Sequence, residues 1–169
     1  MRFQVRRIAA AAAALLVTLA VLFGAQRWLF QTQTSTPLQQ ALQKTAGVQR
    51  VSLDFAQSPG TVDVTLGRVA DLETTYQALS RRVQALASGA TIVVRGSPDG
   101  RLDAAAQDLS FSIAQGLATG QFVAMRQDVL AGARRDGVEA RIYIDQQNVY
   151  LALYDPAHVA YYIYPREAK

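Results

Sequence analysis

The segment VSLDFAQSPGTVDVTLG, residues 51–67, decides the fold because two stretches of alternating apolar and polar residues flank a Pro-Gly pair. The apolar residues occupy every second position: Val51, Leu53, Phe55, Val62, Val64 and Leu66. A period of two with one apolar side is typical of a strand that buries one face. Pro59-Gly60 supplies residues that favour a turn between the stretches. The segment therefore predicts an antiparallel hairpin lying on a core.

Helices are predicted on both sides of this hairpin. Before it, Thr36-Pro37 has the N-cap and first-turn residues of a short helix. After it, Asp71 caps a helix whose apolar residues recur every three or four positions. A third strand is expected over 90–95, and we expect it to be central because its TIVV segment is β-branched on both faces.

The remaining elements complete an α+β pattern. From Arg101 to Asp136 the pattern is helical, with a break near Gly120 because glycine costs about 1 kcal/mol inside a helix. A meander of three strands follows, so the predicted order is α-β-β-α-β-α(α)-β-β-β. Its mostly antiparallel strands form either one sheet of up to six strands or two lobes divided at the Ser97–Gly100 loop. One continuous domain is favoured because each lobe alone has a thin core.

An uncharged apolar run from Ile8 to Ala25 precedes these elements. Its 18 residues span roughly 27 Å as a helix, close to the thickness of a bilayer's hydrocarbon core. Arginines at positions 2, 6 and 7 and the aromatic residues Trp28 and Phe30 after the run predict a single membrane-spanning helix with a cytoplasmic N-terminus. A cleaved signal peptide is the alternative, although the run is long and Phe23 occupies a position where cleavage needs a small residue.

The predicted division is a stub and anchor over 1–30, a polar linker over 31–36 and an extracytoplasmic α+β domain over 37–169, with candidate lobes 37–96 and 101–169. The net charge of +4 belongs to the anchor, because four of the 17 basic residues precede the linker and 13 remain against 13 acidic ones. A neutral domain offers no basic surface for nucleic acid. The absence of cysteine excludes disulfides and thiolate metal sites.

The sequence shows no catalytic constellation. The one histidine, His158, lies in a turn beside Asp155, where a plain polar role is the usual one. Without a second histidine or a cysteine, we expect no metal and no cofactor. An aligned hairpin would place Asp54 opposite Asp63, where the repulsion of like charges favours an offset register or a bound ion. Two solvated carboxylates on an open face are the simplest interpretation. We therefore expect no enzymatic activity.

Tyrosines gather in the last three strands. Five of them are predicted to share the face opposite the aliphatic residues, with Arg141 at its edge: Tyr143, Tyr150, Tyr154, Tyr162 and Tyr164. Tyr161 is assigned to the other face. Aromatic rings with polar tips are common at interfaces, which makes this face the candidate interaction surface. The alternative is that a helix or the first hairpin covers the face and the tyrosines belong to the core.

The element order over 37–96 resembles the ring-building modules of bacterial secretion and sporulation complexes. The segment VDVTLGRVADLETTYQALSRRVQALASGATIVVRG, residues 62–96, is similar to the strand–helix–strand part of alkaline-shock-type small bacterial proteins. The first resemblance implies a membrane-anchored module outside the cytoplasm. Both likenesses concern element order and apolar pattern, cover less than half of the chain and transfer no residue role.

From these features we expect a single-pass, non-enzymatic assembly or interaction protein of the bacterial cell envelope, held in the membrane by residues 8–25. Its partner is a second copy or another protein. The alternative is an extracytoplasmic small-ligand-binding or sensor module that acts through a partner protein, with the tyrosine face or the Gly116–Gly120 break at the edge of its pocket. If the run over 8–25 is cleaved, the protein is secreted instead.

Overall fold

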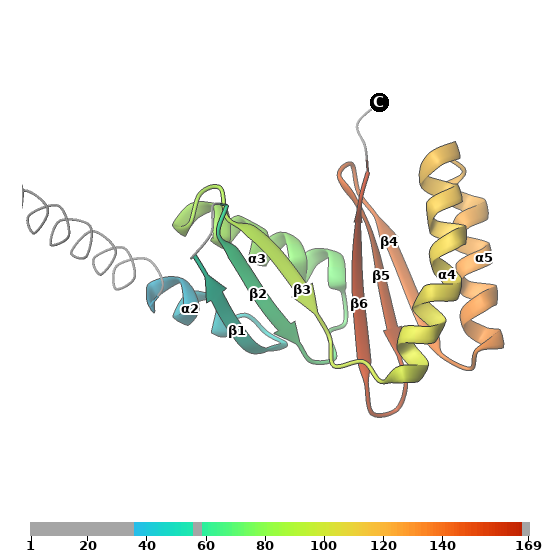
Figure 1. Cartoon of the computed structure of the whole chain (residues 1–169), viewed down its shortest axis with the longest axis horizontal. Helices are drawn as coiled ribbons and strands as arrows, with labels where there is room; N and C mark the ends of the chain where they lie inside the picture. Colours follow the sequence, from blue (N-terminus) through green and yellow to red (C-terminus); the bar gives the residue numbers. More distant parts are fainter. Residues whose placement is uncertain (1–35, 56–58, 167–169) are drawn as a thin grey trace, which may run out of the picture. The chain divides into compact units, whose positions relative to one another are not determined.

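The computed structural model describes residues 36–55 and 59–166 (Figure 1). The predicted anchor over 8–25 and nearly all of the linker over 31–36 lie outside the described residues. Within the described part of the chain, none of the helices combines the length and apolar character needed to cross a bilayer. From Gln39 onward the chain forms one compact unit.

The elements follow the predicted α+β order. In chain order they are α2 (Thr36–Gln43), β1 (Val48–Asp54), β2 (Thr61–Leu66), α3 (Leu72–Leu86), β3 (Thr91–Arg95), α4 (Gly100–Thr119), α5 (Phe122–Arg135), β4 (Glu139–Ile144), β5 (Asn148–Tyr154) and β6 (Val159–Pro165). The break expected near Gly120 is confirmed: Gly120 ends α4 with a φ of 73°, a left-handed conformation that glycine adopts without strain.

The strands form two separate three-stranded sheets, β1-β2-β3 and β4-β5-β6. The arrangement with a single six-stranded sheet is therefore wrong, although most strand pairs are antiparallel as expected. Among the described strands, only β2 and β3 run parallel. The expectation that β3 is central is also wrong, because β2 holds that position. The apolar character of β3 reflects contacts with α3 and with β6 of the other sheet instead of a strand on each side.

The first sheet buries the face that the hairpin pattern predicts. Val62, Val64 and Leu66 of β2 are almost inaccessible to solvent. Asp71 caps α3, accepting a hydrogen bond from the Thr74 amide at 3.3 Å. The hairpin register pairs Asp63 with Ser52, so Asp63 does not face Asp54. Asp63 instead forms an ion pair with Arg95 at 3.1 Å.

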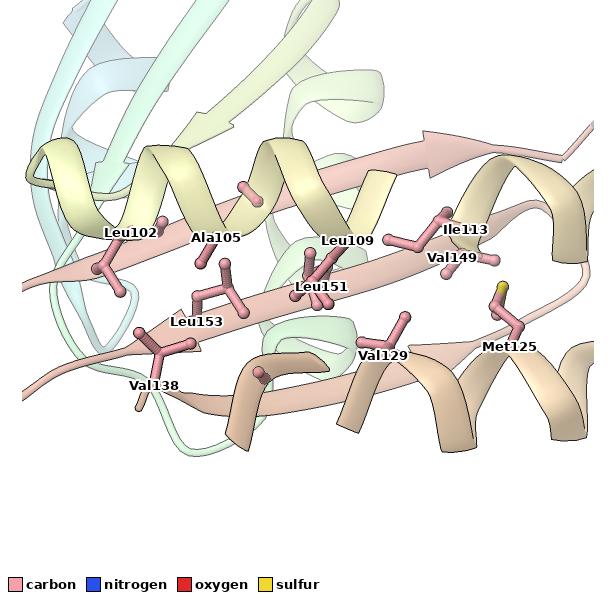
Figure 2. Packing of buried hydrophobic residues seen from close by; sticks show 13 residues of the cluster. Leu102, Ala105, Leu109, Ile113, Met125, Val129, Val138, Val149, Leu151 and Leu153 are labelled. Atoms are coloured by element: carbon pink, nitrogen blue, oxygen red, sulfur yellow. The ribbon is translucent and has the colours of Figure 1, made fainter. Parts of the chain in front are cut away.

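The second sheet is covered on one face by α4 and α5, as Figure 2 shows. Most buried residues of this core come from both helices and from the central strand, among them Leu102, Leu109, Ile113, Met125, Val129, Val149, Leu151 and Leu153. Burying one aliphatic side chain of this size contributes about 1.5–3 kcal/mol. The central strand β5 is buried along both faces, because Tyr150, Ala152 and Tyr154 on its other face are also inaccessible. The residues that cover this second face come from the first half of the chain.

Candidate functional site

The five predicted surface tyrosines do not share one face. The β5–β6 register pairs Leu151 with Tyr162 and Val149 with Tyr164, which places these two tyrosines on the helix-covered face. Tyr161 pairs with Ala152 and therefore lies on the face of Tyr150 and Tyr154. The assignment failed because β6 mixes aliphatic and aromatic residues on both of its faces, so its aliphatic residues did not identify the core side.

Tyr150 and Tyr154 belong to the core, which is the alternative that the sequence left open. Tyr150 is 0% exposed and Tyr154 is 2% exposed. The Tyr150 hydroxyl donates to Asp145 Oδ2 at 2.7 Å, and its ring lies 5.6 Å from that of Tyr76 on α3. Burial raises the pKa of both phenols well above its ordinary value. An interaction role for the half-buried Tyr143, Tyr162 and Tyr164 stays a prediction.

The loop over 67–70, between β2 and α3, is held by the second sheet. The Tyr161 hydroxyl donates to the Gly67 carbonyl at 2.8 Å and accepts from the Val69 amide at 3.1 Å. The Tyr154 hydroxyl donates to the Val69 carbonyl at 3.0 Å. Hydroxyl groups that satisfy buried backbone groups in this way connect the two sheets through specific hydrogen bonds.

Charged groups surround the same loop. Arg141 donates to the Ala70 carbonyl at 3.0 Å and pairs with Glu139 at 2.8 Å. Arg68 reaches the other oxygen of the Glu139 carboxylate at 2.9 Å. The guanidinium groups of both arginines also lie over the ring of Tyr154. Arg141, predicted to flank an interaction surface, therefore already has partners within the chain.

Two strand edges approach each other where the sheets meet (Figure 1). The edge strand β3 and the edge strand β6 contact each other, and a single antiparallel bridge joins Ser97 to Val159. At Gly96 the backbones are so close that a Cβ atom would lie 2.1 Å from the Val159 carbonyl oxygen. Only glycine fits there, and this close approach forms the closed end of a groove.

The groove between β3 and β6 has a volume of about 520 Å³, within the usual range for binding sites. Its walls are formed by Val93, Val94, Arg95, Gly96, Pro98, Asp103, Ala160, Tyr161, Tyr162 and Ile163. Within the described residues, β3 forms a ladder only with β2, and β6 only with β5. The edges that border the groove therefore offer backbone donors and acceptors to an occupant. We call this site the β3–β6 groove.

Polar groups mark the rims of the groove. The Tyr162 hydroxyl donates to Asp103 Oδ1 at 3.0 Å, and burial together with this hydrogen bond raises the Tyr162 pKa well above its ordinary value. Arg95, paired with Asp63, remains largely exposed. The groove thus combines an apolar lining with one acidic and one basic side chain at its borders.

His158 lies just beyond the closed end of the groove. Its Nδ1 atom is 3.2 Å from Asp155 Oδ2 and 3.7 Å from Asp99 Oδ2. In the sequence, His158 lies close to Asp155. Nothing in the sequence indicates that Asp99, which precedes a distant helix, lies close to them in space. Asp99 caps α4, because its carboxylate accepts from the Leu102 amide at 2.9 Å.

A second, more open groove of about 430 Å³ lies between α3 and the β4–β5 turn, with Tyr76, Arg81, Asp145 and Tyr150 in its lining. Burial alone would raise the pKa of Asp145, but hydrogen bonds from Tyr150, two backbone amides and a glutamine outweigh it and lower the pKa. At the Gly116–Gly120 break, Gly116 packs directly against Met125. A pocket edge at this break stays a prediction.

Comparisons with protein-family models, with curated proteins and with solved structures found no match to this chain.

Proposed function

We propose that this chain is a non-enzymatic interaction protein that binds an extended segment of a partner protein in the β3–β6 groove. The observation that carries the proposal is that two strand edges, each without a ladder partner on its outer side, border the same apolar groove. The two edges run antiparallel at the Ser97–Val159 bridge. A partner strand that pairs with either edge would extend the sheet to which that edge belongs.

Strand addition explains why a groove of this kind binds polypeptide. The backbone of an extended segment satisfies the open edges with hydrogen bonds, and alternate side chains enter the lining. Val93 and Ile163 are half-buried positions suited to apolar side chains of the partner. Because backbone hydrogen bonds supply much of the affinity, the partner needs an extended conformation and alternating apolar residues.

The proposed location is the cell envelope, with the groove outside the cytoplasm. The support is the uncharged run over 8–25 and the arginines that precede it. An anchor of this kind concentrates the domain near other membrane-attached proteins, which favours assembly with a second copy or with another envelope protein. Alkaline extraction of membranes and protease accessibility of the C-terminal domain test this location.

Peptide selection with matched variants tests the groove. Short random peptides are selected on the full-length protein in detergent, and the affinity of a labelled peptide is measured by fluorescence anisotropy. Val93→Lys and Ile163→Lys should weaken binding, because each puts a charge into the apolar lining. Ile144→Lys is the matched control, because Ile144 is 39% exposed and lies on β4 at the other edge of the second sheet.

The selected peptide provides a second control. N-methylation of alternate backbone amides removes donors while keeping the side chains, so it should abolish binding if strand addition is correct. Equal binding by the methylated peptide, or by both groove variants with their folded circular-dichroism spectra intact, would contradict the proposal. Light scattering of the full-length protein over a concentration series then shows whether a second copy is the partner.

The groove beside Asp145 supports a second candidate function, binding of a small ligand. It brings the half-buried ring of Tyr76 together with the basic side chain of Arg81. A small aromatic carboxylate matches this lining, so benzoate and its larger analogues are suitable probes. A ligand of the folded state should raise the melting temperature with concentration, and Arg81→Gln should remove that rise.

A further inference from the structure

Three potential metal ligands converge beyond the closed end of the β3–β6 groove, independently of whether the groove binds a peptide. Asp99 precedes α4, whereas Asp155 and His158 lie in the turn between β5 and β6. One ligand atom from each residue lies within 4.8 Å of the other two. Two carboxylate oxygens and one imidazole nitrogen at such separations match part of a divalent-ion coordination shell.

The backbone holds both carboxylates in this orientation. Asp99 Oδ1 accepts from the Leu102 amide at 2.9 Å. Asp155 Oδ1 accepts from the amides of Ala157 at 2.7 Å and His158 at 2.6 Å. In each aspartate the other oxygen, Oδ2, is the one that approaches the imidazole. The ligand atoms are therefore positioned before any ion arrives, which is the condition for a well-formed site.

The local charge provides a separate argument for a cation. The Asp155 side chain is only 7% exposed. Among the described residues, neither Asp99 nor Asp155 forms a salt bridge with a lysine or an arginine. Buried carboxylates are usually paired or coordinate a metal, and a divalent ion would balance both.

We propose that Asp99, Asp155 and His158 bind one divalent transition-metal ion, with Zn²⁺ as the best match. Zn²⁺ takes nitrogen and oxygen ligands in a tetrahedral arrangement, in which a water molecule would complete the shell. Ca²⁺ prefers six or more oxygen ligands, which this set does not supply. The ion joins the start of α4 to the β5–β6 turn and so stabilises the position of the Ser97–Val159 bridge.

Calorimetric titration of the full-length protein, purified in detergent and freed of metal with a chelator, tests the site. ZnCl₂ should bind saturably with one ion per chain. Asp99→Asn and Asp155→Asn keep the oxygen that caps the backbone but lose the charge. Each should weaken Zn²⁺ binding at least about tenfold, since the loss of even an outer-shell partner costs about 10–100-fold.

Asp71→Asn is the matched control. Asp71 caps α3 as Asp99 caps α4, but it lies in no group of converging ligands among the described residues. Its substitution should leave Zn²⁺ affinity unchanged. His158 does not cap a helix or a turn with its side chain, so His158→Phe removes a ligand without removing a cap. This variant remains informative if an asparagine variant fails to fold.

Spectroscopy identifies the imidazole ligand directly. Co²⁺ in place of Zn²⁺ should show visible absorption bands that change in His158→Phe and weaken on acidification, because only a neutral imidazole binds metal. Saturable binding that these substitutions abolish supports the site. Binding that is absent or non-saturable, or that persists unchanged in all three ligand variants, overturns it.

Discussion

Tyr161→Phe is expected to separate the contribution of one hydroxyl group from everything else that connects the two sheets. The Tyr161 side chain is buried, and its hydroxyl bridges the Gly67 carbonyl and the Val69 amide. Phenylalanine preserves the ring and its packing but removes both hydrogen bonds. The Val69 amide is then left buried without its acceptor.

The magnitude follows from two contributions. A typical hydrogen bond contributes a net of about 0.5–1.5 kcal/mol, and a buried donor left unsatisfied costs about 1–3 kcal/mol. Together they predict a loss of about 1.5–4.5 kcal/mol in the free energy of unfolding. This is a large share of the roughly 5–15 kcal/mol that stabilises an ordinary domain.

Urea unfolding of the full-length protein, followed by circular dichroism, measures this loss. Tyr143→Phe is the matched control: Tyr143 pairs with Tyr150 across β4 and β5, but its hydroxyl forms no hydrogen bond within the described residues. That variant should stay within about 0.5 kcal/mol of the parent protein. If Tyr161→Phe and Tyr143→Phe have equal stabilities, the hydroxyl bridge to the 67–70 loop does not hold the two sheets together.

Two further substitutions test the packing between α4 and α5 and the decrease in the free energy of unfolding at low pH. Gly116→Ala should lower the free energy of unfolding by about 1–3 kcal/mol in thermal unfolding, because its methyl group would lie 2.5 Å from Met125 Sδ. Gly100→Ala is the control and should cause no such loss, because the space around its new methyl group is open. Asp145→Asn should destabilise the protein at neutral pH, because Asp145 accepts a hydrogen bond from Tyr150. Since the folded-state pKa of Asp145 is lowered, its contribution is present above its unfolded pKa of about 3.8 and is lost as pH falls through the folded value. The difference from the parent protein in urea midpoints should therefore shrink on acidification below about pH 4, and a difference independent of pH would contradict this role.

The elements that sequence reasoning predicted correctly are those that depend on neighbouring residues. The alternation around Val62 identified the hairpin, since a strand's two faces follow directly from a period of two. Asp71 marked a helix start because its carboxylate satisfies an amide only three residues away. Gly120 marked the helix break for the equally local reason of its backbone conformation.

The features that could not be predicted depend on how distant segments pair. The face of Tyr162 follows from its register with Leu151, which the mixed aliphatic and aromatic pattern of β6 does not reveal. The separation into two sheets depends on which edges meet, and nothing within β3 identifies β6 as its neighbour. The approach of Asp99 to His158 is likewise a result of this tertiary arrangement.

The bridge from Tyr161 to the 67–70 loop also sets an order of events during synthesis of the chain. Gly67 and Tyr161 are 94 positions apart, so the loop emerges long before the hydroxyl that binds it. Closing so long a segment carries an entropic cost before the contact forms, and such contacts form late in folding. Until β6 is complete, the edge of β3 that faces away from β2 lacks its contact with β6, and an uncovered strand edge favours aggregation. A nascent chain of this protein therefore needs protection along β3 until its last described strand has been made.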